Sequence, residues 1–145
     1  MLAKTAKRLG LRYHTREMLR LDAIFSLGAE WFPIIVAIEH ENDYRGFVSE
    51  IIKLLSIRSP LKVGITYLYS REGREQTAIA HIEKLIAENF RNIAKIAPEN
   101  ERSEYLFLVG AENSSAPKQI SRWYSLDFHA CDDWQDKRFK LEANS

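Results

Sequence analysis

Residues 34–41, IIVAIEHE, decide the fold, because an unbroken apolar run ends here in Glu39 and Glu41. A short, continuous apolar segment rich in β-branched residues is typical of a strand that is buried on both faces. We therefore expect residues 34–38 to form a strand inside a sheet, with helices covering the sheet on both sides.

The segment that follows predicts a βαβ unit. Asn42 and Asp43 supply N-cap chemistry for a helix over about 43–57. Its apolar residues recur at helical spacing and form one stripe: Tyr44, Phe47, Val48, Ile51, Leu54 and Leu55. Pro60 then introduces a strand over 61–69, LKVGITYLY, which we expect to run parallel to the first strand.

The segment that precedes residue 34 predicts a hairpin. Residues 19–27, LRLDAIFSL, alternate in polarity as a strand does and carry Asp22 in the middle. A weaker strand pattern over 11–17 can pair with it in the antiparallel sense.

The second half of the chain predicts one helix and two strands. Apolar residues at three- and four-residue spacing indicate a helix over about 72–96, which Pro98 ends. Strands over 104–111 and 120–130 form a terminal antiparallel pair, joined by a turn at 112–118. The fold class is thus α/β, with a mixed central sheet flanked by at least two helices.

Composition restricts the class of protein. The chain has 145 residues, 46% hydrophobic and 28% charged, which fits one globular domain over 1–145. Its single cysteine, Cys131, excludes an internal disulfide and a zinc site built on several thiolates. No segment approaches the roughly 18 apolar residues of a membrane span, so we expect a soluble, cytoplasmic protein without a membrane partner.

Charge is unevenly distributed along the chain. The formal net charge is only +1, but residues 1–20 contain one acid, Glu17, against six basic residues: Lys4, Lys7, Arg8, Arg12, Arg16 and Arg20. Two interpretations remain open, a solvated basic surface and a patch that binds an anion such as DNA.

The candidate chemistry lies at the end of the buried strand. Alternate residues of a strand face the same way, so Glu39 and Glu41 project together from the carboxyl edge, where α/β proteins commonly bind ligands. Asp22, on the neighbouring strand, is the natural third oxygen donor. Carboxylates without thiolates favour Mg²⁺ or Mn²⁺, an arrangement suited to phosphodiester hydrolysis.

The next helix adds Glu50 and Lys53, one turn apart. Lys53 can stabilise charge that develops on a phosphate, and Glu50 is a secondary candidate. The alternative is that the acids only mark where a strand meets solvent, and that Glu50–Lys53 is a surface ion pair.

In order, LRLDAIF, IIVAIEHEN, SEIIKLL and LKVGITY resemble the PD-(D/E)XK nuclease superfamily, which has the restriction-endonuclease-like fold. The resemblance covers about residues 11–70. It implies an αβββαβ core, with residues 71–145, the C-terminal helix and the antiparallel strand pair, as elaboration.

The resemblance assigns roles to four residues. Asp22 takes the place of the motif aspartate and Glu39 that of the second acid. Glu41 stands where most members have lysine, and Lys53 lies where some members place that basic residue. In the family the acids bind Mg²⁺, the metal activates water and a DNA phosphodiester is cut.

Two features depart from the family pattern. No proline precedes Asp22. The first residues, MLAKTAKRLGL, lack the acid that members often carry on a helix before the first strand, so that helix is shortened, divergent or missing.

Three functions therefore stand as hypotheses. The first is a Mg²⁺-dependent DNA endonuclease in which Asp22, Glu39 and Glu41 hold the metal, Lys53 stabilises charge and the basic segment contacts phosphates. The second is a non-catalytic nucleic-acid-binding or assembly module with the same fold. The third is a small-molecule hydrolase on another α/β sheet. The small size of the chain also suggests a homodimer around a DNA duplex.

Overall fold

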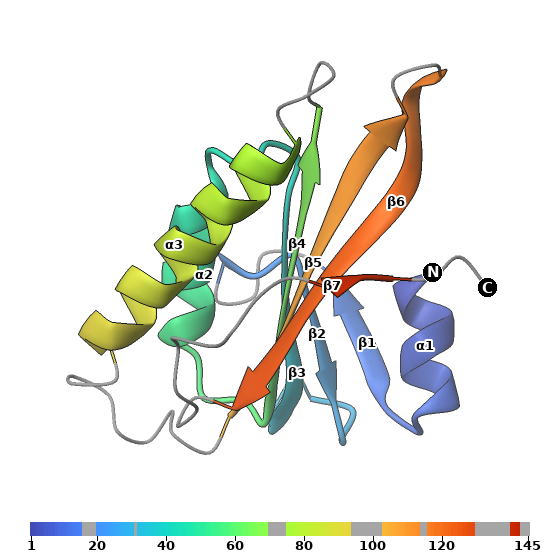
Figure 1. The fold of residues 1–145 in the computed structure, drawn as a ribbon. Helices are drawn as coiled ribbons and strands as arrows, with labels where there is room; N and C mark the ends of the chain where they lie inside the picture. The colour runs from blue at the N-terminus through green and yellow to red at the C-terminus, as the bar shows by residue number, and fades with distance from the viewer. Residues whose placement is uncertain are drawn as a thin grey trace.

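The computed structural model describes residues 1–15, 20–30, 32–69, 75–93, 103–113, 116–129 and 140–142 (Figure 1). Along the chain its elements are α1 (Leu2–Arg8), β1 (Arg12–Thr15), β2 (Ala23–Ser26), β3 (Ile34–Glu41), α2 (Phe47–Leu55), β4 (Leu61–Leu68), α3 (Glu75–Ile93), β5 (Glu104–Asn113), β6 (Ala116–His129) and β7 (Lys140–Leu141).

The strands form one mixed sheet whose spatial order follows the chain, β1 to β7. The pairs β3–β4 and β4–β5 are parallel, and the other pairs are antiparallel. This confirms the α/β class, the N-terminal hairpin, the parallel βαβ unit around α2 and the antiparallel pair β5–β6. The parallel pairing of β4 with β5 across α3 adds a second crossover that we did not predict.

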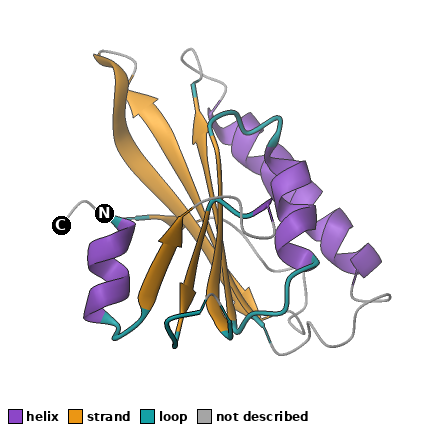
Figure 2. Ribbon diagram, turned by 180° about the vertical axis from the view of Figure 1, so that it is seen from behind, coloured by secondary structure: helices purple, strands orange, loops and turns teal. Residues whose placement is uncertain are grey.

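Helices cover both faces of the sheet. α2 and α3 lie on one face and α1 lies on the other (Figures 1 and 2). Alternation along β3 assigns side chains to these faces: Ala37 belongs to the core under α2 and α3, whereas Val36 and Ile38 pack with Ala6 of α1. Glu39 therefore points toward α2, on the same face as Ala37.

Several predicted boundaries were wrong. The predicted helix over 43–57 begins at Phe47, with Gly46 as N-cap and no side-chain capping bond. Asp43 instead accepts the backbone N–H of Arg45 and pairs with its guanidinium, which stabilises a turn before the helix. In contrast, the strand from Ile34 ends at Glu41, as predicted when Glu39 and Glu41 were placed at its carboxyl edge, and β4 pairs with it up to Thr66.

Other boundaries shift by a few residues. The strand predicted over 19–27 is regular only from Ala23 to Ser26. The turn predicted over 112–118 is shorter, since β5 reaches Asn113 and β6 begins at Ala116. An N-terminal helix is present as α1, seven residues long and without an acid in its first turn. The predicted ends of the 72–96 helix, and Pro98, lie outside the described residues.

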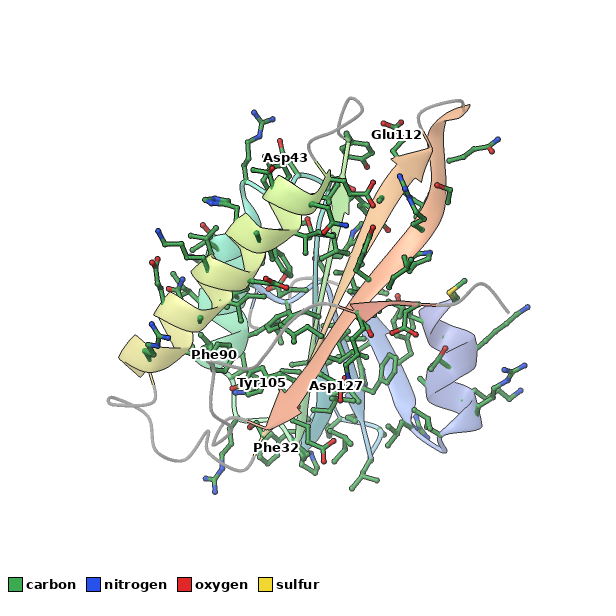
Figure 3. All side chains as sticks on the ribbon, in the orientation of Figure 1. Phe32, Asp43, Phe90, Tyr105, Glu112 and Asp127 are labelled. Carbon is green, nitrogen blue, oxygen red and sulfur yellow. The ribbon has the colours of Figure 1, made fainter. Side chains whose placement is uncertain are left out.

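A lysine is buried in the core beneath α3. The Lys62 ammonium donates a hydrogen bond to the Tyr105 hydroxyl at 3.0 Å. The Tyr105 ring packs edge-on against Phe90 of α3, with the ring centroids 4.6 Å apart (Figure 3). Burial lowers the pKa of Lys62 to about 8 and raises the pKa of Tyr105. Lys62 pairs in register with Ala37, so it lies toward the amino end of β4, away from Glu41.

Within the described ranges, no helix is both long enough and apolar enough to cross a bilayer.

Candidate active site

Glu39 is the centre of the candidate site. It lies near the carboxyl end of β3, in register with Gly64 of β4, and is 0% exposed. A carboxylate buried this completely is unfavourable unless a positive charge compensates it, and such groups cluster at functional sites.

A lysine from α2 supplies the nearest charge. The Lys53 ammonium forms an ion pair with Glu39 and lies 3.0 Å from its Oε1. Lys53 also forms an ion pair with Glu50, one turn earlier on α2, and donates to the Arg20 carbonyl at 3.3 Å. We refer to the Glu39 carboxylate, the Glu50 carboxylate and the Arg20 carbonyl as the oxygen cluster.

The pKa values of Glu39 and Lys53 are both shifted from their ordinary values. Burial raises the pKa of Glu39 to about 8, and Glu50 adds to this effect, while Lys53 opposes it. Burial opposes the charge on Lys53, but its contacts with Glu50 and Glu39 hold the pKa of Lys53 above its ordinary value.

Asp22 lies next to this cluster. It precedes β2, whose Ala23 pairs with Ile38, and its Oδ2 accepts the backbone N–H of His40 at 2.8 Å. That bond ties the Asp22 carboxylate to the residue following Glu39. The structure thus brings Glu39, Lys53 and Glu50 into contact, whereas the printed contact of Asp22 is with the backbone next to Glu39.

Glu41 lies apart from the cluster. Its Oε1 accepts the backbone N–H of Asp43 at 3.1 Å, and its Oε2 lies so close to Gly46 that a Cβ there would be 2.9 Å away. Glu41 therefore supports the turn that leads into α2. Although it shares a face with Glu39, its hydrogen bond is directed toward this turn.

The predicted three-carboxylate set does not form a ready-made metal site. Within the described ranges, no three Asp, Glu, His or Cys side chains converge in a way that could hold an ion. Any cation would have to be held by fewer carboxylates together with other ligands.

The basic segment is exposed but lies mostly on the other face of the sheet. Lys4, Lys7 and Arg8 belong to α1 and Arg12 to β1, and all four are exposed. Arg16 lies outside the described residues. Arg20 alone adjoins the oxygen cluster, through its backbone carbonyl, and its side chain is exposed.

Sequence reasoning missed the Arg20 carbonyl of the site and a second buried polar group, the Thr66 hydroxyl. Thr66 pairs in register with Glu41 and is buried, and its hydroxyl has no hydrogen-bond partner among the described residues. It lies two residues beyond Gly64, on the same face of β4. A backbone carbonyl leaves no signal in a sequence, and a threonine in a strand is ordinary.

Thr66→Val is expected to raise the free energy of unfolding by about 1 kcal/mol, because it removes a buried hydroxyl that lacks a partner. Urea denaturation at pH 7 measures this change. Thr77→Val on the exposed surface of α3 is the control and should stay within about 0.5 kcal/mol of the original protein. A loss of stability in Thr66→Val would mean that the hydroxyl is hydrogen-bonded in solution.

Comparisons of the chain with protein-family models, curated proteins and solved structures find no match. Function must therefore be inferred from the site itself.

Proposed function

We propose that the protein hydrolyses phosphodiester bonds of DNA with the help of Mg²⁺ or Mn²⁺, using Asp22, Glu39 and Lys53. The observation that carries this proposal is Glu39: a fully buried carboxylate at the carboxyl end of a parallel strand, paired with a lysine. A fold that only needed stability would replace this group with an apolar residue.

The residues present fit a cation held by few protein ligands. Mg²⁺ is commonly bound by one or two carboxylates and keeps its other positions for water and phosphate oxygens. Glu39 is one such carboxylate, already paired with a positive charge, and Asp22 is a second carboxylate at the same end of the sheet. When bound, such an ion lowers the pKa of its water and neutralises charge on the phosphate. Glu41 is not in this revised ligand set.

Lys53 is suited to act on the substrate. Its side chain is 34% exposed, so the ammonium can reach solvent while its stem stays beside Glu39. An ammonium in this position donates hydrogen bonds to a non-bridging phosphate oxygen and stabilises the charge that builds up in the transition state. Asp22, by accepting the His40 N–H, holds β2 and β3 together at the point where the reacting groups meet.

The location of the basic residues limits how DNA can bind. Lys4, Lys7 and Arg8 lie on α1, across the sheet from Lys53, so a duplex at the site does not contact them without passing around the β1 edge. Arg20 is the basic residue of the segment that we assign to phosphate contact at the site. A DNA partner and a homodimer both stay predictions.

Cleavage of a supercoiled plasmid and of labelled duplex DNA, with Mn²⁺ or Mg²⁺, tests the proposal. Glu39→Gln and Asp22→Asn are expected to lower the rate about 100-fold or more. Glu88→Gln, which alters only the exposed Lys84–Glu88 pair, should keep the full rate. Cleavage that persists in Glu39→Gln, or that needs no divalent cation, contradicts the proposal.

The non-catalytic DNA-binding module is the second candidate. It is favoured by one observation: the Lys53 ammonium already pairs with Glu39 and Glu50, and within the described ranges no three acids converge on a position that could hold a metal. Salt-dependent DNA binding by a protein that never cleaves would select this function.

A further inference from the structure

We propose that the Lys53 ammonium and a divalent cation compete for the oxygen cluster of Glu39, Glu50 and the Arg20 carbonyl. This inference rests on the proposed function for the kind of ligand. It takes Glu50 and a main-chain carbonyl, in place of Asp22, as the ligands beside Glu39, and it makes Lys53 an internal competitor that leaves when the metal binds.

The contacts of Lys53 define the cation position. Three oxygens surround its ammonium: Glu39 Oε1 at 3.0 Å, the Arg20 carbonyl at 3.3 Å and a carboxylate oxygen of Glu50. Two carboxylates and a carbonyl are hard oxygen donors of the kind that Mg²⁺ and Mn²⁺ prefer. The positive charge of Lys53 thus occupies a place that such an ion could take.

The burial of Glu39 supports a cation at this position. The carboxylate is 0% exposed, and the Lys53 ammonium lies 3.0 Å from its Oε1. A buried carboxylate needs a compensating positive charge, which either an ammonium or a metal ion can supply.

Lys53 also has a route out of the cluster. Its side chain is 34% exposed, whereas that of Glu50 is 15% exposed and that of Glu39 only 1%. The long lysine stem can rotate its ammonium into solvent while the two carboxylates stay in place. Once displaced, the same ammonium is available to a bound phosphate, as the proposed function requires.

Calorimetric titration of the full chain with Mn²⁺ tests the competition. If the ammonium fills the cluster in about nine molecules of ten, Lys53→Met should tighten the apparent Kd about tenfold. Adding Glu50→Gln to Lys53→Met should remove that gain. Lys84→Met, a lysine of α3 whose only ion pair shown is with exposed Glu88, is the matched control and should bind like the original protein.

The outcomes separate this inference from the proposed function. Equal Mn²⁺ affinity of the original protein and Lys53→Met overturns the competition, and the proposed function survives if Glu39→Gln still abolishes binding. Binding by Lys53→Met alone supports the competition and overturns the metal-dependent function of the natural chain. Absence of binding in every variant overturns both. Circular dichroism establishes that each variant is folded, and Lys53→Gln replaces Lys53→Met if that variant fails to fold.

Discussion

Glu39→Gln is expected to stabilise the metal-free protein at pH 8.5, by on the order of 3 kcal/mol, while leaving its stability at pH 5 nearly unchanged. The pKa of Glu39 is raised from 4.5 to about 8 in the folded state, chiefly by burial. The folded protein therefore binds this proton more tightly than the unfolded chain does. Stability from the protonated acid is present below pH 4.5 and is lost as the pH rises toward 8.

Urea denaturation in the presence of a chelator, at pH 5 and pH 8.5, measures this effect. Glutamine resembles the protonated acid, so the variant should lack the loss of stability that the original protein shows over this range. Lys62, with a lowered pKa of about 8, titrates in both proteins, and its effect cancels when the two are compared. Glu88→Gln, at an exposed site, is the control. A Gln variant less stable at both pH values would show that Glu39 is a net stabilising partner of Lys53.

Gly64→Ala is expected to destabilise the fold by about 3 kcal/mol or more, because the new methyl group has no room. A Cβ at Gly64 would lie 2.6 Å from Phe107 Cδ1 and 2.8 Å from Phe47 Cζ. Both rings are buried and pack edge-on, with their centroids 5.7 Å apart. Neither can therefore move without disturbing the core under α2. Since Gly64 pairs with Glu39, movement of Phe47 would also displace the helix that carries Lys53.

Thermal unfolding of Gly64→Ala tests this expectation, with Gly28→Ala as the matched control. A Cβ at Gly28 would come no closer than 3.9 Å to any neighbour, which is ordinary contact. We expect the midpoint of Gly28→Ala to stay within a few degrees of the original and that of Gly64→Ala to fall by on the order of 10 °C. Equal midpoints would mean that the two rings are loosely packed.

The central part of the fold could be predicted because hydrophobic patterns reflect burial directly. The apolar run ending at Glu39, the stripe from Phe47 to Leu55 and the strand from Leu61 each bury the residues expected of them. The start of α2 could not be predicted. Asp43 is a good N-cap in general, but its pairing with Arg45 fixes a turn instead.

Sequence reasoning singled out Glu39, Lys53 and Glu50, which the structure brings into contact, but it did not predict their geometry. Alternation along a strand correctly places Glu39 and Glu41 on one face, yet their environments differ: Glu39 is buried under α2, and Glu41 supports a turn. That difference depends on how α2 packs, which involves residues distant in the sequence. The Arg20 carbonyl and the buried Thr66 hydroxyl became visible only in three dimensions.

The central claim is that Glu39 binds a divalent cation, and anomalous diffraction from crystals soaked in Mn²⁺ tests it most directly. The account predicts an anomalous peak about 2.0–2.5 Å from a Glu39 oxygen, with the Lys53 ammonium moved away from it. A peak elsewhere, or no peak with Lys53 still paired to Glu39 and Glu50, would contradict it.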